Sequence, residues 1–371
     1  MKQRVFGRMN FIFPDDGVML TDAAGESSGE GLVIEVTVDS ARGRTLTLNG
    51  MPMEITRLGV YACKICLRDY KTSLTVRDEE SGEEISSDVY YLKRAHKKYR
   101  FSLDDNIWFL YNLTANKDKY SSMFEDPYLA LLKRIHDEYG SVFHINIYYE
   151  DPKYGFNLSE MTDKYKDEWR NNSDWLRLSF HANADSPARP YAHASYEEAY
   201  FEAQRVNKEI LRFAGEEAYA KTVTTVHYGD CTVEAARALR ALGYRAFPSS
   251  AHKKTNGIDI RMYLDSEQCE ILREYGFYYD KENDIIHFRY NGGIQNVSPE
   301  QIPDKFAAQE VATPKYIFKD ICLHEQYFYP DYPRHQPNYY EKLSTSASWC
   351  KEHGYEPMFM DEIFEFDTHK K

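Results

Sequence analysis

Residues 100–106 read RFSLDDN, and this run decides how the rest of the chain is interpreted. Apolar and polar residues alternate up to two adjacent carboxylates, Asp104 and Asp105. Neighbouring residues of a strand point to opposite faces, so a strand interior rarely holds an Asp-Asp pair. At a strand end the chain opens out, and one carboxylate can bind a metal while its neighbour accepts a proton. A solvated turn is the alternative interpretation of the pair alone.

From about residue 96 onward, strand-like runs alternate with helical ones, a pattern typical of parallel β/α units. Residues 278–288 predict a hairpin within this region, and Ser195 predicts the capped start of a long helix that ends at Phe213. The strand-like runs after residue 106 are 142–149, 175–181, 222–227, 244–247, 317–324 and 357–360. Helices are expected around 159–171 and 338–353. This pattern over residues 96–371 predicts a parallel (β/α) barrel of about seven strands.

Residues 1–95 have a different pattern, which predicts a small all-β domain in front of the barrel. Asn49-Gly50 is a strong signal for a tight turn between two strands. The strand-like runs are 32–38, 44–48, 59–63, 73–76 and 89–92. Short strands at this spacing predict a β-sandwich. The arrangement resembles the immunoglobulin-like accessory modules of carbohydrate-active enzymes, and the fold class expected for the whole chain is α/β.

Composition excludes several classes of partner. The formal net charge of −13 argues against a nucleic-acid or anionic-membrane partner. No run approaches 18 consecutive apolar residues, so we expect no membrane span. The basic residues near the start are not followed by an apolar stretch, and we therefore expect a cytoplasmic protein. Of the six cysteines only Cys63 and Cys66 are closely spaced, which favours reduced thiols over a zinc knuckle.

Polar residues recur at the ends of several strand-like runs. His181, His227 and His324 each end such a run, as does the pair Asp104 and Asp105. The C-terminal ends of the strands in a parallel barrel open onto one face, where these side chains would meet. A lone histidine is more often structural, but three at equivalent positions beside two carboxylates favour a site. Zinc commonly takes two histidines and one carboxylate, and it lowers the pKa of a bound water toward about 7.

Residues 98 to about 363 resemble the polysaccharide deacetylase family, the NodB-homology enzymes of the glycoside hydrolase/deacetylase superfamily. The first family motif usually ends Phe-Asp-Asp-Gly, and the last contains Leu-His-Asp. The matching runs, in chain order, are FSLDDN at 101–106, LSFH at 178–181, VHYG at 226–229 and ICLHE at 321–325. The resemblance implies that Asp104 is the catalytic base, Asp105 a metal ligand and His324 the general acid.

The chain departs from the family pattern at two motifs. The second motif normally has a further histidine four residues after the first, and Asp185 has that position here. His193 could reach the site only across the loop at 187–190. The third motif's arginine is replaced by Thr225, and a proline of that motif is replaced by His227.

We therefore expect Asp105, His181 and His227 to bind a divalent metal, most simply zinc, with Asp185 next and His193 as a further alternative. The predicted activity is a metal-dependent hydrolase that removes an acyl group, N-acetyl above all, from a carbohydrate or a glycan precursor.

Two other functions stay open at this point. One is a metal-independent glycoside hydrolase on the same barrel that would use Asp104 with Glu325. The other is a non-catalytic glycan-binding protein that would stack sugars on the tyrosine-rich segment 327–333. The substrate, the metal and the formation of a homo-oligomer are not decided by the sequence.

Overall fold

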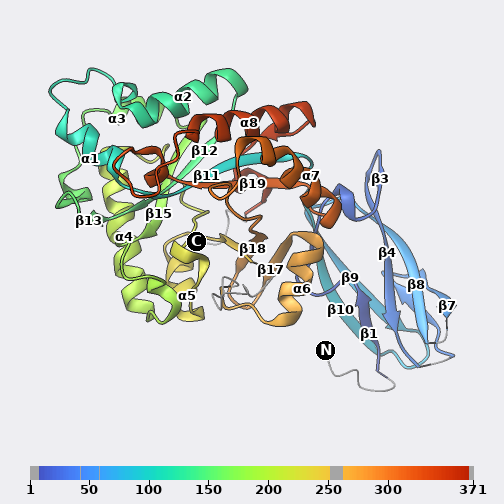
Figure 1. The fold of residues 1–371 in the computed structure, drawn as a ribbon. Coiled ribbons are helices and arrows are strands. Elements are labelled where there is room, and N and C mark those ends of the chain that lie inside the picture. The colour runs from blue at the N-terminus through green and yellow to red at the C-terminus, as the bar shows by residue number, and fades with distance from the viewer. Residues whose placement is uncertain (1–7, 42, 58, 251–261, 367–371) are drawn as a thin grey trace.

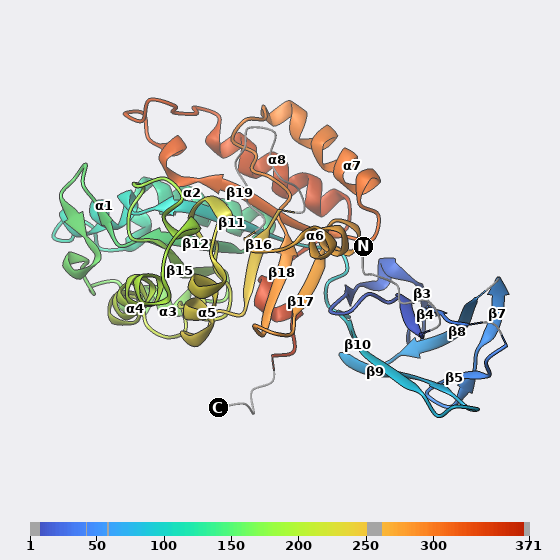
Figure 2. The same ribbon diagram turned by 90° about the horizontal axis from the view of Figure 1, so that it is seen from below.

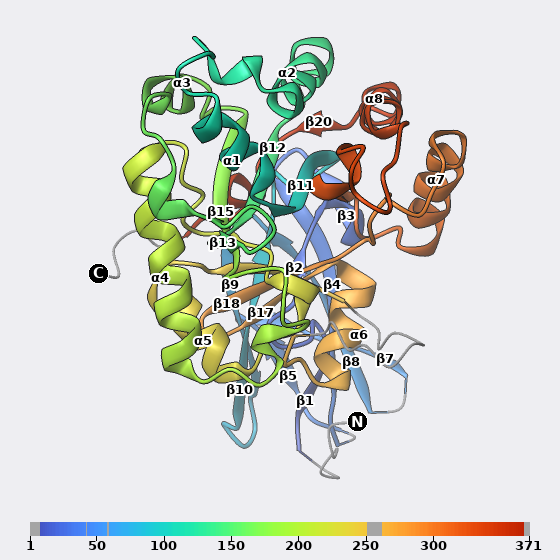
Figure 3. The same ribbon diagram turned by 60° about the vertical axis from the view of Figure 1, so that its left-hand side comes forward.

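The structure is a computed structural model that describes residues 8–41, 43–57, 59–250 and 262–366. Two mainly antiparallel sheets built from the first hundred residues lie beside a larger α/β region, as Figures 1 and 2 show. Helices lie around the outside of the central strands in the α/β region (Figure 3). Within the described ranges, no helix combines the length and the apolar character needed to cross a bilayer.

The N-terminal strands form two sheets of five strands that share one apolar core. The first contains β1 (Asn10–Phe13), β3 (Glu26–Ser28), β4 (Gly31–Asp39), β7 (Glu54–Arg57) and β8 (Val60–Leu67). The second contains β2 (Met19–Leu20), β5 (Leu46–Leu48), β6 (Met51–Pro52), β9 (Lys71–Asp78) and β10 (Glu84–Tyr91). Buried and half-exposed residues alternate along β4, so each inward side chain meets the other sheet.

The predicted tight turn is confirmed by the backbone. Asn49 and Gly50 both have positive φ, 48° and 81°, and they join β5 to β6 as a two-residue hairpin turn. The all-β character of this region is thus observed, whereas an immunoglobulin-like identity and a domain boundary at residue 95 stay predictions.

The α/β region is organised on a parallel sheet in the order β15-β12-β11-β19. These strands are β11 (Lys98–Asn106), β12 (Phe143–Tyr148), β15 (Leu176–Ala182) and β19 (Phe318–His324). The helices are α1 (Trp108–Ala115), α2 (Pro127–Tyr139), α3 (Lys166–Asn171), α4 (Tyr196–Phe213), α5 (Val233–Ala241), α6 (Ser266–Tyr275), α7 (Ile302–Ala312) and α8 (Tyr339–Glu352). The parallel sheet with helices confirms the predicted α/β class, and the predicted cap of α4 by Ser195 is present.

A second, three-stranded sheet continues the parallel arrangement. It contains β16 (Ala246–Ser249), β17 (Phe277–Asp280) and β18 (Ile285–Arg289), with β16 parallel to β18 and the predicted β17–β18 hairpin antiparallel. Isolated parallel bridges, Leu178 to Tyr219 and Val223 to Ala246, connect β15 to β16. One backbone hydrogen bond joins Ile294 to β19. The closed barrel of about seven strands stays a prediction, because the two sheets are connected here only by isolated bridges and one backbone hydrogen bond and not by continuous strand pairing.

Three predicted elements differ from the structure. The run 222–227 is not a regular strand, because a turn at His227–Gly229 with Tyr228 at a φ of 64° ends the extended chain. The last strand is only β20, Glu356–Pro357; Met358 donates one further backbone hydrogen bond to Tyr99, and the chain then turns at Met360–Ile363. The helix expected around 159–171 begins only at Lys166.

The N-terminus of α1 is capped by a carboxylate from far along the chain. Glu325 accepts hydrogen bonds from the backbone N–H groups of Ile107 at 2.7 Å, Trp108 at 3.0 Å and Phe109 at 2.7 Å. The Tyr329 hydroxyl donates a fourth, at 2.9 Å. Burial raises the pKa of Glu325 to about 7, although the four donors favour the carboxylate. The cap joins the end of β19 to the end of β11.

This cap predicts a pH-dependent contribution to stability. The pKa of Glu325 in the folded chain, about 7, lies above the ordinary 4.5, so folding favours the protonated carboxyl group. Its contribution to the free energy of unfolding is therefore complete below pH 4.5 and is lost as the pH rises to 7. The loss amounts to about 3 kcal/mol. In Glu325→Gln the free energy of unfolding, measured by urea denaturation, should fall less over this range than in the wild type. The exposed Glu197→Gln serves as control. Parallel pH profiles for Glu325→Gln and the wild type would contradict the assignment.

Candidate metal centre

Asp104 and Asp105 both line one cavity because β11 is irregular at its end. The register of β11 with β12 shifts between Leu103 and Asn106, as in a β-bulge. Asp105 has a φ of 61°, in the left-handed region that few residues other than glycine adopt. On a regular strand the two side chains would point to opposite faces. The bulge therefore brings both carboxylates to the same side.

Three donor atoms converge beside this bulge. Oδ1 of Asp105 lies 3.0 Å from Nε2 of His181 and 3.2 Å from Nδ1 of His227, and these two nitrogens are 3.1 Å apart. Ligands of a tetrahedral zinc ion with bonds of roughly 2.0–2.1 Å lie about 3.3 Å from one another. The donor atoms and their spacing therefore fit a divalent cation with two nitrogen ligands and one oxygen ligand.

The hydrogen bonds around the two imidazoles select the nitrogens that face the centre. Nδ1 of His181 donates to the backbone carbonyl of Thr225, which leaves the lone pair of Nε2 directed at Asp105. Nε2 of His227 lies 3.2 Å from the backbone carbonyl of Asp185, which leaves Nδ1 for the centre. An outer hydrogen bond of this kind is usual for a histidine that binds a metal.

The charges at the centre are mutually dependent. Burial alone would raise the pKa of Asp105, but the imidazoles of His324, His181 and His227 hold it well below its usual range. Burial would lower the pKa of His181, but Asp105 and Asp104 raise it. The centre is thus arranged around a carboxylate that stays ionised.

Tyr148 is a further polar group at the centre that the sequence analysis did not select. Its hydroxyl donates to Oδ1 of Asp105 and lies 3.1 Å from Nδ1 of His227 and 3.4 Å from Oδ1 of Asp185. The register of β12 with β15 shifts at Ile147 and Tyr148, which places the ring at the mouth of the sheet. Tyr148 lies one residue before the end of the strand-like run 142–149, close to the position that selected the histidines.

The two alternative ligands lie outside the group of three donor atoms. The carboxylate of Asp185 is not part of the group, since only its backbone carbonyl contacts His227. His193 is exposed and lines a separate cavity of about 270 Å³. The loop at 187–190 carries His193 away from the strand ends.

Asp104 is held beside the centre by buried polar side chains. Its Oδ1 accepts hydrogen bonds from Nδ2 of Asn146 at 2.6 Å and from Oγ of Ser102 at 3.3 Å. Oδ1 of Asn146 in turn accepts from Oγ of Ser179 at 2.7 Å and from the N–H of Thr225 at 3.2 Å. These contacts fix the orientation of the Asp104 carboxylate.

The same chain of hydrogen bonds continues into the interior. Nε2 of His144 donates to Ser179 at 2.7 Å, and its Nδ1 accepts from Arg100 at 2.8 Å. Arg100 also forms a buried ion pair with Asp320 at 2.7 Å. Burial and the charge of Arg100 lower the pKa of His144 well below its usual range, so the ring is neutral and has one donor nitrogen. Every donor between Arg100 and Asp104 therefore points toward Asp104.

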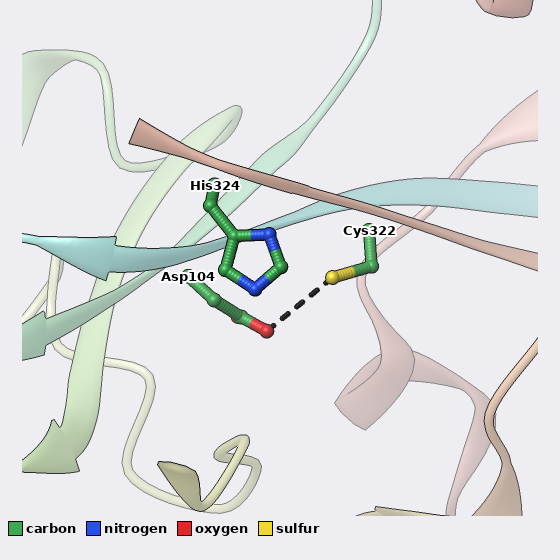
Figure 4. Close-up of side chains that lie close together, drawn as sticks. All are labelled: Asp104, Cys322 and His324. Atoms are coloured by element: carbon green, nitrogen blue, oxygen red, sulfur yellow. Dashed lines mark hydrogen bonds between the residues drawn. The ribbon is translucent and has the colours of Figure 1, made fainter. Parts of the chain in front are cut away.

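His324 and Cys322 lie on the other side of Asp104, on the neighbouring strand. His324 is paired in register with Asp104, and its Nε2 is 3.9 Å from Oδ2 of Asp105. The thiol of Cys322 donates to Oδ2 of Asp104 at 3.4 Å, as Figure 4 shows. Nε2 of Gln326 donates to Oδ2 of Asp105 at 2.9 Å.

The cavity that contains these groups has a volume of about 620 Å³. Tyr228, Tyr327, Tyr332 and Arg334 line it together with the polar centre. Tyr228 is 43% exposed and has a φ of 64°, a strained conformation for a tyrosine. Glu325 is not among the lining residues of this cavity.

No family model and no curated protein matches this sequence. Among solved structures, the chain is similar to the 4-alpha-glucanotransferase from Thermococcus litoralis, at 12% identity and a TM-score of 0.46. That match covers 74% of this chain and 41% of the other, so the chain spans less than half of that enzyme's length. A putative alpha-galactosidase from Bacteroides fragilis matches at 9% identity and a TM-score of 0.26, with 93% and 78% covered. The resemblance to the deacetylase family stays a prediction.

The convergence of three donor atoms predicts a zinc site that depends on both histidines. His181→Gln and His227→Gln should each weaken zinc binding by more than about 100-fold, because changes in outer hydrogen bonds alone cost 10- to 100-fold. Isothermal titration of the metal-free protein measures this. His287→Gln, which changes a buried histidine outside the centre, should bind zinc as the wild type does. Unchanged affinity in His181→Gln would contradict the site.

Proposed function

We propose that the protein is a divalent-metal-dependent hydrolase that removes an acyl group, N-acetyl above all, from a carbohydrate. The observation that supports this most is the set of three donor atoms, 3.0 to 3.2 Å apart, beside a second carboxylate in an open cavity. Tyrosine rings at the mouth of the cavity are suited to stacking on a sugar.

Asp105, His181 and His227 would hold the cation, and their nitrogen and oxygen donors favour zinc. A bound divalent cation lowers the pKa of its water toward neutrality and polarises a carbonyl oxygen. Asp105, His181 and His227 all line the cavity, so a cation that they held would be accessible to a substrate there.

Asp104 would accept the proton of the attacking water. Asn146 and Ser102 bind one of its carboxylate oxygens, which fixes the side chain at the edge of the cavity. A proton acceptor must lie within hydrogen-bond reach of its water, so a fixed orientation next to Asp105 is what this role requires.

His324 would protonate the leaving nitrogen. It is the residue paired with Asp104 on the adjacent strand, and its ring faces the Asp104 carboxylate (Figure 4). Its Nε2 lies 3.9 Å from Oδ2 of Asp105. The proton acceptor and the proton donor would therefore lie side by side at one level of the sheet, both at the edge of the cavity.

The pair Asp104 and Glu325 does not suit the metal-independent glycoside hydrolase. Both oxygens of Glu325 are bound by backbone N–H groups at the start of α1, and the side chain is fully buried outside the cavity lining. Two carboxylates that act on one glycosidic bond must both face it. Glu325 is a helix cap instead.

The proposed activity is tested by the release of acetate from N-acetylglucosamine oligomers. A chelator should abolish release, and added zinc should restore it. Asp104→Asn should lower kcat by about 10²- to 10⁴-fold, the usual contribution of a general base, and should still bind zinc. Asp280→Asn, which changes a buried aspartate of the β17–β18 hairpin, should keep its activity. Full activity in Asp104→Asn would rule out this mechanism, and tight oligomer binding without turnover would support a glycan-binding protein.

Asn146 is a positioning residue in this scheme, because it acts through Asp104. Asn146→Ala should lower kcat by about 10- to 100-fold through the misplaced carboxylate, with little change in KM or in zinc affinity. Asn207→Ala is the matched control, since Asn207 is also a buried amide and accepts a hydrogen bond from Tyr244 outside the cavity. An equal loss of kcat in both variants would show that Asn146 has only a general structural role.

A further inference from the structure

A second set of donor atoms lies next to the first. One carboxylate oxygen of Asp104, one ring nitrogen of His324 and the sulfur of Cys322 all lie within 4.8 Å of one another. In Figure 4 the imidazole, the carboxylate and the sulfur face a common space. The sulfur is 3.4 Å from Oδ2 of Asp104, close to the spacing of two ligands on one cation with metal–sulfur bonds of about 2.3 Å.

The strand register explains why these three groups meet. Cys322 and His324 are two residues apart on β19, so they point to the same face of the sheet. Asp104 is paired with His324 on the adjacent β11 and therefore shares that face. Cys322 and Asp104 are only 2% and 5% exposed, so two of the three ligands are already withdrawn from water.

Asp105 connects the two sets of donors. Its Oδ1 faces His181 and His227, whereas its Oδ2 lies 3.9 Å from Nε2 of His324. A carboxylate with one oxygen directed at each of two cations is the usual bridge of a two-metal site, in which the ions are about 3.5–4 Å apart. The second set can thus draw on a fourth ligand.

We propose that Asp104, Cys322 and His324 form a second cation site, which takes a thiophilic divalent ion such as cadmium or excess zinc and inhibits the hydrolase when occupied. A sulfur, an imidazole nitrogen and a carboxylate oxygen select soft or borderline ions over magnesium and calcium. The thiol of Cys322 loses its proton to solvent as the sulfur–metal bond forms, whereas the first set of donors contains no thiol. The second site should therefore fill after the first.

The inhibition rests on the proposed function, whereas the cation site does not. Asp104 and His324 are the proposed proton acceptor and proton donor, and a cation bound to both occupies the lone pairs that the reaction needs. Activity should therefore rise with the first equivalent of zinc and fall as excess zinc is added.

The site is tested by cadmium titration of the metal-free full chain. The parent for this experiment is the double variant Cys63→Ser with Cys66→Ser, which lacks the two half-buried thiols. The titration follows the ultraviolet absorption of the cadmium–thiolate bond. This parent should bind two equivalents, with the absorption arising from the second. Cys322→Ala should bind one equivalent without the absorption, and Cys322→Ser, which retains a hydrogen-bonding group, should do the same. Cys350→Ala removes another buried thiol and should retain both equivalents.

Two results separate this inference from the proposed function. His181→Gln should lose the first equivalent and keep the thiolate absorption; an intact first equivalent in that variant would overturn the proposed function alone. Absence of the absorption in the parent, or its persistence in Cys322→Ala and Cys322→Ser, would overturn the second site. In activity assays, the activity of each protein is expressed relative to its own maximum. The zinc concentration that halves this activity should be at least ten times higher for Cys322→Ala than for the parent. Equal zinc concentrations for half inhibition would overturn the inhibitory role.

Discussion

The contact between the Asp105 carboxylate and two imidazoles is the interaction on which the rest of the site depends. Asp105 is kept in a left-handed conformation, which costs on the order of 1–3 kcal/mol and persists only where the surroundings fix it. His181, His227 and the Tyr148 hydroxyl all bind its Oδ1. Without the bulge between Leu103 and Asn106, Asp105 would face away from the cavity, and the imidazoles would have no carboxylate between them.

A second constraint comes from the interior of the sheet. Arg100 and Asp320 form a buried ion pair, and such a pair is costly to remove from water. Arg100 also donates a hydrogen bond to His144, and this bond begins the chain of hydrogen bonds that leads through Asn146 to Asp104. The buried charge thus has a consequence at the cavity, since it orients the carboxylate that would accept a proton.

The convergence of the strand-end side chains on one cavity could be predicted from the sequence. Asp104, Asp105, His181, His227 and His324 were selected because each ends a strand-like run, and all five line one cavity in the structure. Parallel strands make this possible, since position along the strand is enough to decide at which edge a side chain lies.

The remaining parts could not be predicted, because they depend on local irregularity and on pairing between distant segments. A bulge leaves no sequence signature in RFSLDDN, and Asn146 looks like any polar residue of an alternating strand. Glu325 follows a motif histidine and looked like a catalytic carboxylate, yet it caps a helix more than 200 positions earlier in the chain. Cys322 was interpreted only as a reduced thiol. Its contact with Asp104 depends on the register between β19 and β11, which the sequence does not give.

The central claim is that Asp105, His181 and His227 hold one divalent cation. Anomalous scattering from zinc-soaked crystals, recorded on both sides of the zinc absorption edge, tests it most directly. The account predicts a peak within bonding distance, about 2.0–2.2 Å, of Oδ1 of Asp105, Nε2 of His181 and Nδ1 of His227. Strong zinc peaks elsewhere, with none between these three atoms, would contradict it.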